Sequence, residues 1–268
     1  MTTVKTLAKW AMTAVAPQTA TVIMSARARA HSQRLARQWG LIDLNRRLVS
    51  HLGAVVQAGP FRGMALTPMT HDEHLGPYLL GTYESELHPW IEHLTGRRFR
   101  QVLDVGSKFG YYAVGLALRL PWTPIVAFDP DPWARKATEQ MIAANGTSLV
   151  TVEPLCSAMW LDRHLAPNSL IVSDCEGFEG ELFPSATTSA LDSSTLLVEI
   201  HDNLIPGVGR AVRDRFARTH AVAVVTNRDH AEPTVDLSFL TSEDAASAAR
   251  EIRGPQEWLL FTPVDRGR

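Results

Sequence analysis

The sequence predicts an α/β fold in which a mainly parallel sheet carries helices on both faces. From Gln101 onward, short aliphatic and β-branched runs alternate with longer stretches of helical periodicity. Such alternation is typical of strand–helix–strand units, which build parallel sheets. The chain before Gln101 is more helical in character, and it predicts an N-terminal helical extension.

The extension and its connector precede the sheet. Between Ser32 and Leu52, apolar residues recur at spacings near three or four, with arginines between them. Glycines and prolines then punctuate a connector, after which YESELHPWIEHL (83–94) predicts one helix. We therefore expect an extension with its connector at 1–77 and a main domain at 78–268.

The main domain follows a regular order of strands and helices, without an internal repeat. The predicted strands are VLDV (102–105), PIVAFD (124–129), LVTVEPL (149–155), LIVSD (170–174), LLVEI (196–200), AVAVVT (221–226) and WLLFTP (258–263). The predicted helices between them include 110–120, 132–144 and 208–219. In an open sheet of this kind, ligands bind beyond the carboxyl ends of the strands.

The turn after the first strand is the most informative segment. The strand ends at Asp104, and Gly106 and Gly110 precede an amphipathic helix, so the backbone and the helix N-terminus can approach a ligand. A dinucleotide-binding turn has the pattern G-x-G-x-x-G, but Lys108 occupies the middle glycine position here. Asp104 would repel a pyrophosphate and suits a ligand with an ammonium and a sulfonium, as in S-adenosylmethionine (SAM). The alternative is that the glycines merely permit a tight turn.

The second strand ends in another carboxylate. Asp129, 25 residues after Asp104, can accept hydrogen bonds from both ribose hydroxyls of an adenosine. The alternative role is to cap the helix that Pro130 and Pro132 introduce. Asp131 fits that capping role as well, which leaves Asp129 for the ligand.

Several stretches resemble the class I SAM-dependent methyltransferases, and most closely the FkbM-type methyltransferases. They are VLDVGSKFGYY, VAFDPDP, the Asn145–Gly146 pair, SDCEGFEGELF and LLVEIHD, within about 78–265. The resemblance implies a Rossmann-like, doubly wound, seven-stranded sheet whose last strand is antiparallel and inserted as a hairpin, here AVAVVT and WLLFTP. It also implies SAM as the cofactor and methylation, commonly of a hydroxyl oxygen. Lys108 departs from the family pattern, in which glycine or asparagine is more usual.

The cofactor site is assigned to residues at and before the first, second and fourth strand ends. They are Glu84, Asp104, Gly106, Ser107, Lys108, Gly110, Tyr111, Asp129, Pro130 and Asp174. Glu84 has two alternative roles, contact with the methionine ammonium or pairing with a surface arginine. Trp133 and Trp160 are candidates to lie near the adenine.

The catalytic residues are expected at the ends of the fourth and fifth strands, as His201, Asp174 and Glu199. His201 is the preferred base, because an unperturbed histidine titrates near neutrality; the alternative is a polar loop residue. A competing hypothesis places Mg²⁺ on the hard oxygen ligands of Asp174, Glu199 and Asp202. Glu179 is interpreted as a favourable charge at a helix N-terminus.

The leading functional hypothesis is O-methylation of a hydroxyl on a small molecule, a sugar or a natural product. The alternatives are a SAM-fold binding protein without catalysis and an NAD(P)-dependent oxidoreductase, which Asp104 and the missing glycine disfavour. DCEG (174–177) replaces the Asn/Asp-Pro-Pro-aromatic turn typical of amino methylation of nucleobases. A nucleic-acid substrate therefore has only the basic N-terminus in its favour.

Composition limits the remaining classes. Apolar residues make up 45% and charged residues 20%, as in an ordinary globular protein, and two cysteines exclude a disulfide scaffold. Residues 1–60 contain eight Lys/Arg and one acidic residue, whereas residues 61–268 contain 18 Lys/Arg and 27 acidic residues.

We expect a cytoplasmic protein with a small-molecule substrate, no nucleic-acid partner and no transmembrane segment. Weak membrane-surface contact through the basic N-terminus and homo-oligomerisation stay open. THDEH (70–74) is expected to be a solvated loop.

Overall fold

The structure, a computed structural model, describes residues 27, 30, 31, 33–70, 74–184, 188–227 and 231–264. Residues 1–26 of the basic N-terminus and residues 71–73 of the THDEH segment lie outside these ranges. The expectations for them therefore stay predictions. Among the described residues, no helix has both the length and the apolar character needed to cross a bilayer.

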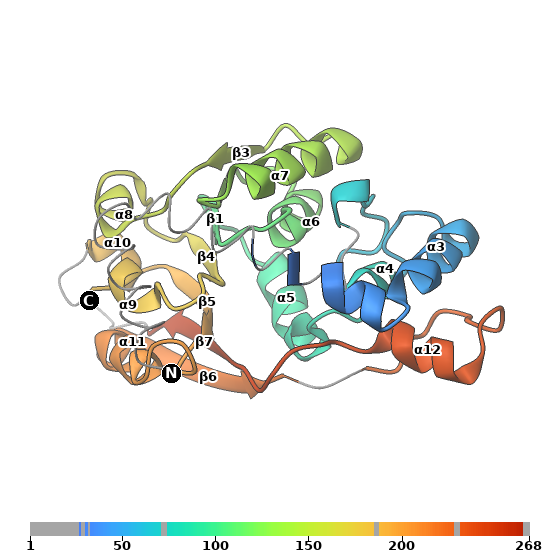
Figure 1. The fold of residues 1–268 in the computed structure, drawn as a ribbon. Helices are drawn as coiled ribbons and strands as arrows, with labels where there is room; N and C mark the ends of the chain where they lie inside the picture. Colours follow the sequence, from blue (N-terminus) through green and yellow to red (C-terminus); the bar gives the residue numbers. More distant parts are fainter. Residues whose placement is uncertain are drawn as a thin grey trace.

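Seven strands form one sheet in the order β3-β2-β1-β4-β5-β7-β6 (Figure 1). They are β1 (Val102–Val105), β2 (Ile125–Phe128), β3 (Val150–Glu153), β4 (Leu170–Ser173), β5 (Thr195–Ile200), β6 (His220–Thr226) and β7 (Glu257–Pro263). The strands β1 to β5 pair in parallel, whereas β7 pairs antiparallel to both β5 and β6. The predicted doubly wound sheet with an inserted C-terminal hairpin is thus confirmed.

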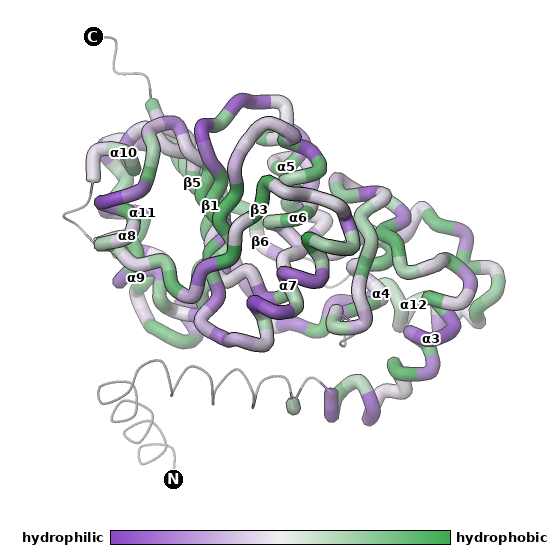
Figure 2. The backbone as a smooth tube through the Cα atoms, turned by 90° about the horizontal axis from the view of Figure 1, so that it is seen from above, coloured by the Kyte–Doolittle hydropathy of each residue, from purple (hydrophilic) through white to green (hydrophobic). Residues whose placement is uncertain are grey.

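Helices cover both faces of the sheet because its central strands are apolar on both sides. All residues of β1, β4 and β5 are buried. Within β1, Val102 joins one hydrophobic cluster, while Leu103 and Val105 join the other. Figure 2 shows hydrophobic strands at the centre and hydrophilic segments mostly at the periphery.

The first face is covered by α5 (His88–Thr95), α6 (Tyr111–Arg119) and α7 (Pro132–Asn145), the second by α8 (Ala158–His164), α9 (Glu179–Leu182), α10 (Ser189–Asp192) and α11 (Val208–Phe216). Asp131 caps α7 by accepting a hydrogen bond from the Trp133 N–H, as predicted. The single helix predicted over 83–94 is instead a 3-10 turn (Ser85–Leu87) followed by α5. The reason is Pro89, which stands in the first turn of α5, where a missing N–H leaves no hydrogen bond unmade.

The helical extension packs at one end of the molecule. It contains α3 (Leu41–Leu52) and a 3-10 turn (Pro68–Thr70), and the predicted boundary after residue 77 falls inside α4 (Leu75–Leu80). Both α3 and α4 contact α12 (Ser242–Ala249), which comes from near the other chain end (Figure 1). Leu41, Leu44 and Leu48 form the buried face of α3. This face belongs to the same hydrophobic cluster as α6 and α7, so the extension shares its core with the sheet domain.

Candidate active site

The carboxyl ends of the parallel strands meet at one edge of the sheet. The strand β1 lies between β2 and β4, so the chain order of the strands reverses its direction across the sheet at β1. In open sheets of this kind, ligands bind beside such a point, beyond the carboxyl ends of the strands. The register places Val105, the last residue of β1, beside Phe128 of β2 and Ser173 of β4. Asp129 and Asp174, which follow β2 and β4, therefore begin at the same edge.

The glycine turn after β1 is shaped by its neighbours. Gly106 has a φ of +88°, and a Cβ there would overlap the carbonyl oxygen of Asp174. Gly110 has a φ of +84°, and a Cβ there would lie 2.8 Å from Cγ2 of Thr138. Backbone packing thus requires both glycines, and the assignment of a ligand depends on the side chains around the turn.

Lys108 occupies a left-handed backbone conformation in the turn after β1. Its φ is +50°, in the left-handed region that glycine and asparagine adopt more readily. Its N–H donates a hydrogen bond to Oδ2 of Asp129 at 3.0 Å. Its ammonium lies 5.8 and 5.6 Å from the ring centroids of Tyr78 and Phe109. The departure from glycine therefore places a cation on aromatic rings beside the turn.

Asp104 is buried at the wall of a small cavity between the ends of β1 and β4. Its side chain accepts a hydrogen bond from the Ala113 N–H of α6 at 2.9 Å. Burial raises the pKa of Asp104 to about 7. The cavity is lined by Tyr78, Tyr83, Asp104, Gly106, Ser107, Lys108, Phe109, Tyr111, Tyr112, Val172 and Asp174. It brings together six of the predicted cofactor residues with aromatic residues that sequence reasoning did not include.

Asp129 connects the first and second strand ends. Its Oδ2 accepts from the Lys108 N–H, and its Oδ1 accepts from the Asp131 N–H at 2.8 Å. The neighbouring carbonyl oxygens of Asp129 and Pro130 accept hydrogen bonds from Arg135 at 2.8 and 2.9 Å. Asp129 is only partly buried, so its carboxylate also borders the solvent side of this edge.

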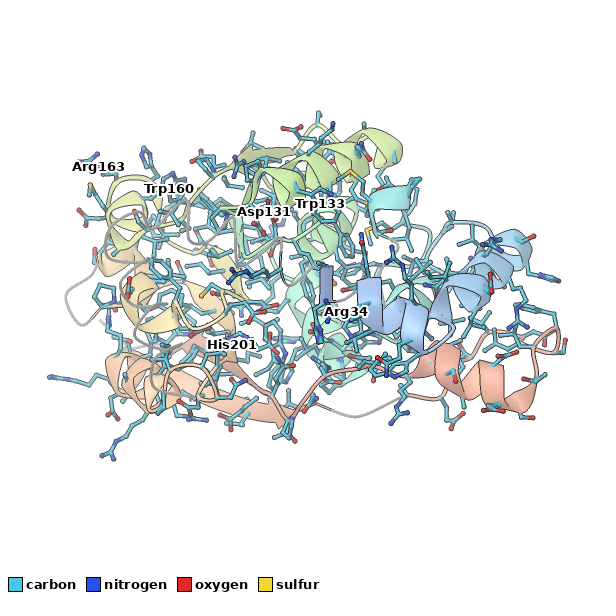
Figure 3. The ribbon with its side chains drawn as sticks, viewed as in Figure 1. Arg34, Asp131, Trp133, Trp160, Arg163 and His201 are labelled. Carbon is cyan, nitrogen blue, oxygen red and sulfur yellow. The ribbon has the colours of Figure 1, made fainter. Side chains whose placement is uncertain are left out.

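The two candidate adenine-side tryptophans differ in their surroundings. Trp160 of α8 donates through Nε1 to Glu153 of β3 at 2.9 Å, and its ring packs edge-on against Phe128 with centroids 4.8 Å apart. Trp133 of α7 packs instead against the hydrophobic cluster on the opposite face. Figure 3 labels both with Asp131 and His201. Of the two, Trp160 is tied to the end of β3 through Glu153.

Glu84 lies in an ionic cluster that sequence reasoning missed. It is 2% exposed, and it pairs with Arg253 at 3.0 Å and accepts a hydrogen bond from the Tyr112 hydroxyl. Arg253 also pairs with Glu86 at 2.5 Å and Glu251 at 2.9 Å. The predicted arginine partner is thus buried, with a side chain 9% exposed, rather than at the surface. Burial raises the pKa of Glu84 to about 7, although the charge of Arg253 opposes this shift.

His201 lies at the centre of a group of carboxylates, which we call the His201 cluster: His201, Asp174, Glu176, Glu179 and Glu199. Its Nδ1 is 2.6 Å from Oε1 of Glu179. Its Nε2 is 3.4 Å from Asp174, 3.7 Å from Glu199 and 3.8 Å from Glu176. Burial alone would lower the pKa of His201, but the hydrogen bond to Glu179 and the carboxylate charges raise it above its ordinary value. The three predicted catalytic residues are therefore neighbours.

Glu179 lies at a helix N-terminus, as predicted, and it also contacts His201. It is the first residue of α9, and its side chain is fully buried against His201. The same Oε1 accepts a hydrogen bond from the Gly177 N–H at 3.1 Å. In the sequence, the repeated acidic residues of DCEGFE (174–179) were the signal that could have indicated this contact.

The predicted metal ligands are only partly neighbours. Asp202 is exposed, and its Oδ1 accepts a hydrogen bond from the Gly209 N–H of α11 at 3.0 Å, so it caps that helix. Among the described residues, the ligand atoms that lie within 4.8 Å of one another belong to Asp174, Glu176 and His201. Glu176 is thus the candidate ligand in place of Asp202, because the turn after β4 brings Glu176 near the end of β5.

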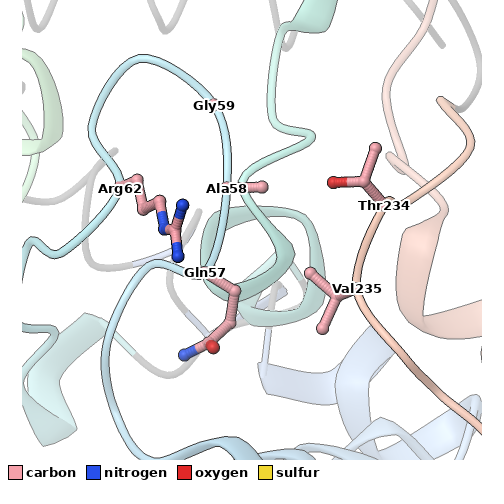
Figure 4. A pocket seen from close by; sticks show the side chains of 6 residues that line it. All are labelled: Gln57, Ala58, Gly59, Arg62, Thr234 and Val235. Carbon is pink, nitrogen blue, oxygen red and sulfur yellow. The ribbon is translucent and has the colours of Figure 1, made fainter.

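A second hollow lies apart from the strand ends. It is formed by the loop after α3 and the segment before α12 (Figure 4), and its lining residues are Gln57, Ala58, Gly59, Arg62, Thr234 and Val235. It includes none of the predicted site residues.

No protein-family model matches the sequence, and no curated protein matches it. Solved structures with a similar arrangement include the SAM complex of the O-methyltransferase TomG from Streptomyces achromogenes (18% identity, TM-score 0.43, 64% of this chain and 77% of that chain). Others are precorrin-6y C5,15-methyltransferase from Geobacter metallireducens (13%, 0.43, 64% and 86%) and a putative O-methyltransferase from Klebsiella pneumoniae (13%, 0.45, 86% and 100%). Similarity at this level carries no information about the activity or the acceptor of this chain.

Proposed function

We propose that the chain is a SAM-dependent methyltransferase that methylates a hydroxyl group of a small molecule, such as a sugar or a natural product. The observation that carries this proposal is the gathering of Asp104, Asp129 and Asp174 around the glycine turn at one edge of the sheet. A cationic cofactor is stabilised by such a ring of carboxylates, whereas a pyrophosphate is repelled by it.

The carboxylates can be matched to parts of SAM. Asp104 and Asp174 line the cavity, where they would face the ammonium and the sulfonium. Asp129 follows β2, at the position where an acidic residue accepts the ribose hydroxyls of an adenosine. Lys108 and Trp160 border the same edge. SAM supplies the methyl group on a sulfonium when it is bound.

The His201 cluster provides for the acceptor. Bound SAM would supply the methyl group to the acceptor oxygen, and its sulfur would keep the electron pair of the broken carbon–sulfur bond. The hydroxyl proton must leave to a group within hydrogen-bond reach. His201, Asp174 and Glu199 are adjacent to the cofactor cavity through Asp174, so we assign proton removal to this cluster.

The experiment is methyl transfer from labelled SAM to a panel of sugars, polyketides and small alcohols. We expect transfer to hydroxyl acceptors by the wild-type chain, with His201→Ala retaining SAM affinity and losing roughly a hundredfold or more in rate. His93→Ala, at an exposed position of α5, is the matched control. Full activity of His201→Ala would reject the role of the cluster. SAM binding without transfer to any acceptor would favour the non-catalytic binding protein.

A further inference from the structure

Negative charge is concentrated around one imidazole. Four carboxylates, those of Asp174, Glu176, Glu179 and Glu199, lie 2.6 to 3.8 Å from the ring nitrogens of His201. Burial and the charge of Asp174 raise the pKa of both Glu199 and Glu176. A divalent cation among these carboxylates would offset their mutual repulsion.

Four buried atoms of the cluster lack hydrogen-bond partners within the described part of the chain. They are Nε2 of His201, Oδ1 of Asp174, Oε2 of Glu179 and Oε1 of Glu199. The side chains of His201 and Glu199 are only 1% and 3% exposed. Because a buried polar atom without a partner is costly, these atoms are evidence for a bound group that pairs with them.

The contact between Glu179 and His201 determines what Nε2 can accept. When Nδ1–H donates to Glu179 at 2.6 Å, a neutral ring carries its lone pair on Nε2. That lone pair faces oxygens of Asp174, Glu199 and Glu176, and this arrangement is repulsive unless a cation or a proton lies between them. A carboxylate behind a metal-binding histidine is the usual outer-shell arrangement.

The spacing of the ligand atoms suits one metal ion. One atom each from Asp174, Glu176 and His201 lie within 4.8 Å of one another. Ligands about 2.0–2.4 Å from a shared ion lie at most about 4.8 Å apart. Glu176 is 77% exposed, so an ion can enter from solvent on its side.

We propose that Asp174, Glu176 and His201 bind one divalent cation of the Mn²⁺ type, with Glu179 positioning His201 from behind. The imidazole ligand favours Mn²⁺ over the predicted Mg²⁺, because Mg²⁺ takes oxygen ligands almost exclusively. The ligand set also replaces the predicted Asp202 by Glu176 and His201. The role of the cation rests on the proposed function: it would activate the acceptor hydroxyl, and His201 would then be a ligand rather than the base.

The test is titration of the metal-stripped, full-length protein with Mn²⁺, followed by calorimetry and by the electron paramagnetic resonance signal of free Mn²⁺. We expect one Mn²⁺ per chain, with binding weakened about tenfold or more in Glu176→Gln and His201→Ala and in the positioning variant Glu179→Gln. Asp202→Asn is the matched control and should bind Mn²⁺ as the wild type does. Glu176→Gln changes an exposed side chain, so its folding is not at risk.

The proposal is overturned if the wild type binds no Mn²⁺, or if Glu176→Gln and His201→Ala bind it with unchanged affinity. Methyl transfer at full rate in EDTA, together with absent Mn²⁺ binding, would reject the cation and leave the methyltransferase standing. Mn²⁺ binding by a wild-type protein that does not bind SAM would support the cation site and reject the proposed methyltransferase function.

Discussion

Asp104 combines negative charge with almost complete burial. Its side chain is 3% exposed and holds the start of α6 through the Ala113 N–H. Burial raises its pKa from 3.8 to about 7. Between these values the unfolded chain has already released the proton that the folded protein retains. The free energy of unfolding therefore falls as the pH rises through this window and levels off above about 7.

Asp104→Asn should remove this dependence, because asparagine can accept the Ala113 hydrogen bond without titrating. Between pH 5 and pH 7, we expect the wild type without ligand to lose about 2 kcal/mol of unfolding free energy relative to Asp104→Asn. Urea unfolding at both pH values measures the difference, and Asp162→Asn on the exposed side of α8 is the control. Parallel pH curves for the wild type and Asp104→Asn would contradict the account.

Single residues also show what a sequence can predict about the site. Asp131 was correctly predicted to cap α7, because capping depends on residues two or three positions away. Glu179 lies at a helix N-terminus as predicted, but its burial was not predicted, since it depends on His201, which is 22 residues further along the chain. The aromatic lining from Tyr78 was missed for the same reason, because long-range packing brings Tyr78 to the cavity.

At the scale of elements, Arg253 joins the segment before β7 to the segment before α5. It pairs with Glu84, Glu86 and Glu251, and all four side chains are at least nine-tenths buried. The pairs with Glu84 and Glu86 span 169 and 167 residues, so no local sequence pattern predicts them. The alternation of strands and helices was predictable, whereas the contact that holds the two segments together was not.

Arg253→Gln should destabilise the protein by about 3–5 kcal/mol, because it leaves three buried carboxylates without their cation. Thermal unfolding, followed by circular dichroism, measures the change as a lower midpoint. Arg250→Gln, three residues earlier and exposed, should leave the midpoint nearly unchanged. An equal midpoint in Arg253→Gln and the wild type would show that the cluster does not hold these segments.

For the whole molecule, the extension and the sheet domain share one hydrophobic cluster. Arg47 of α3 pairs with Asp244 of α12 at 2.8 Å, so the lobe at the end of the sheet is built from both halves of the chain. The boundary between 1–77 and 78–268, the cytoplasmic location and the oligomeric state stay predictions. The acidic excess of 61–268 is explained in part, because much of it converges on the strand ends and the His201 cluster.

The central claim is that the strand ends hold SAM, and titration calorimetry tests it most directly. We predict that SAM binds the wild type, that NAD does not, and that Asp129→Ala weakens SAM binding about tenfold or more through the lost ribose contact. Asp162→Ala should bind SAM with wild-type affinity. Tight binding of NAD without binding of SAM would contradict the account.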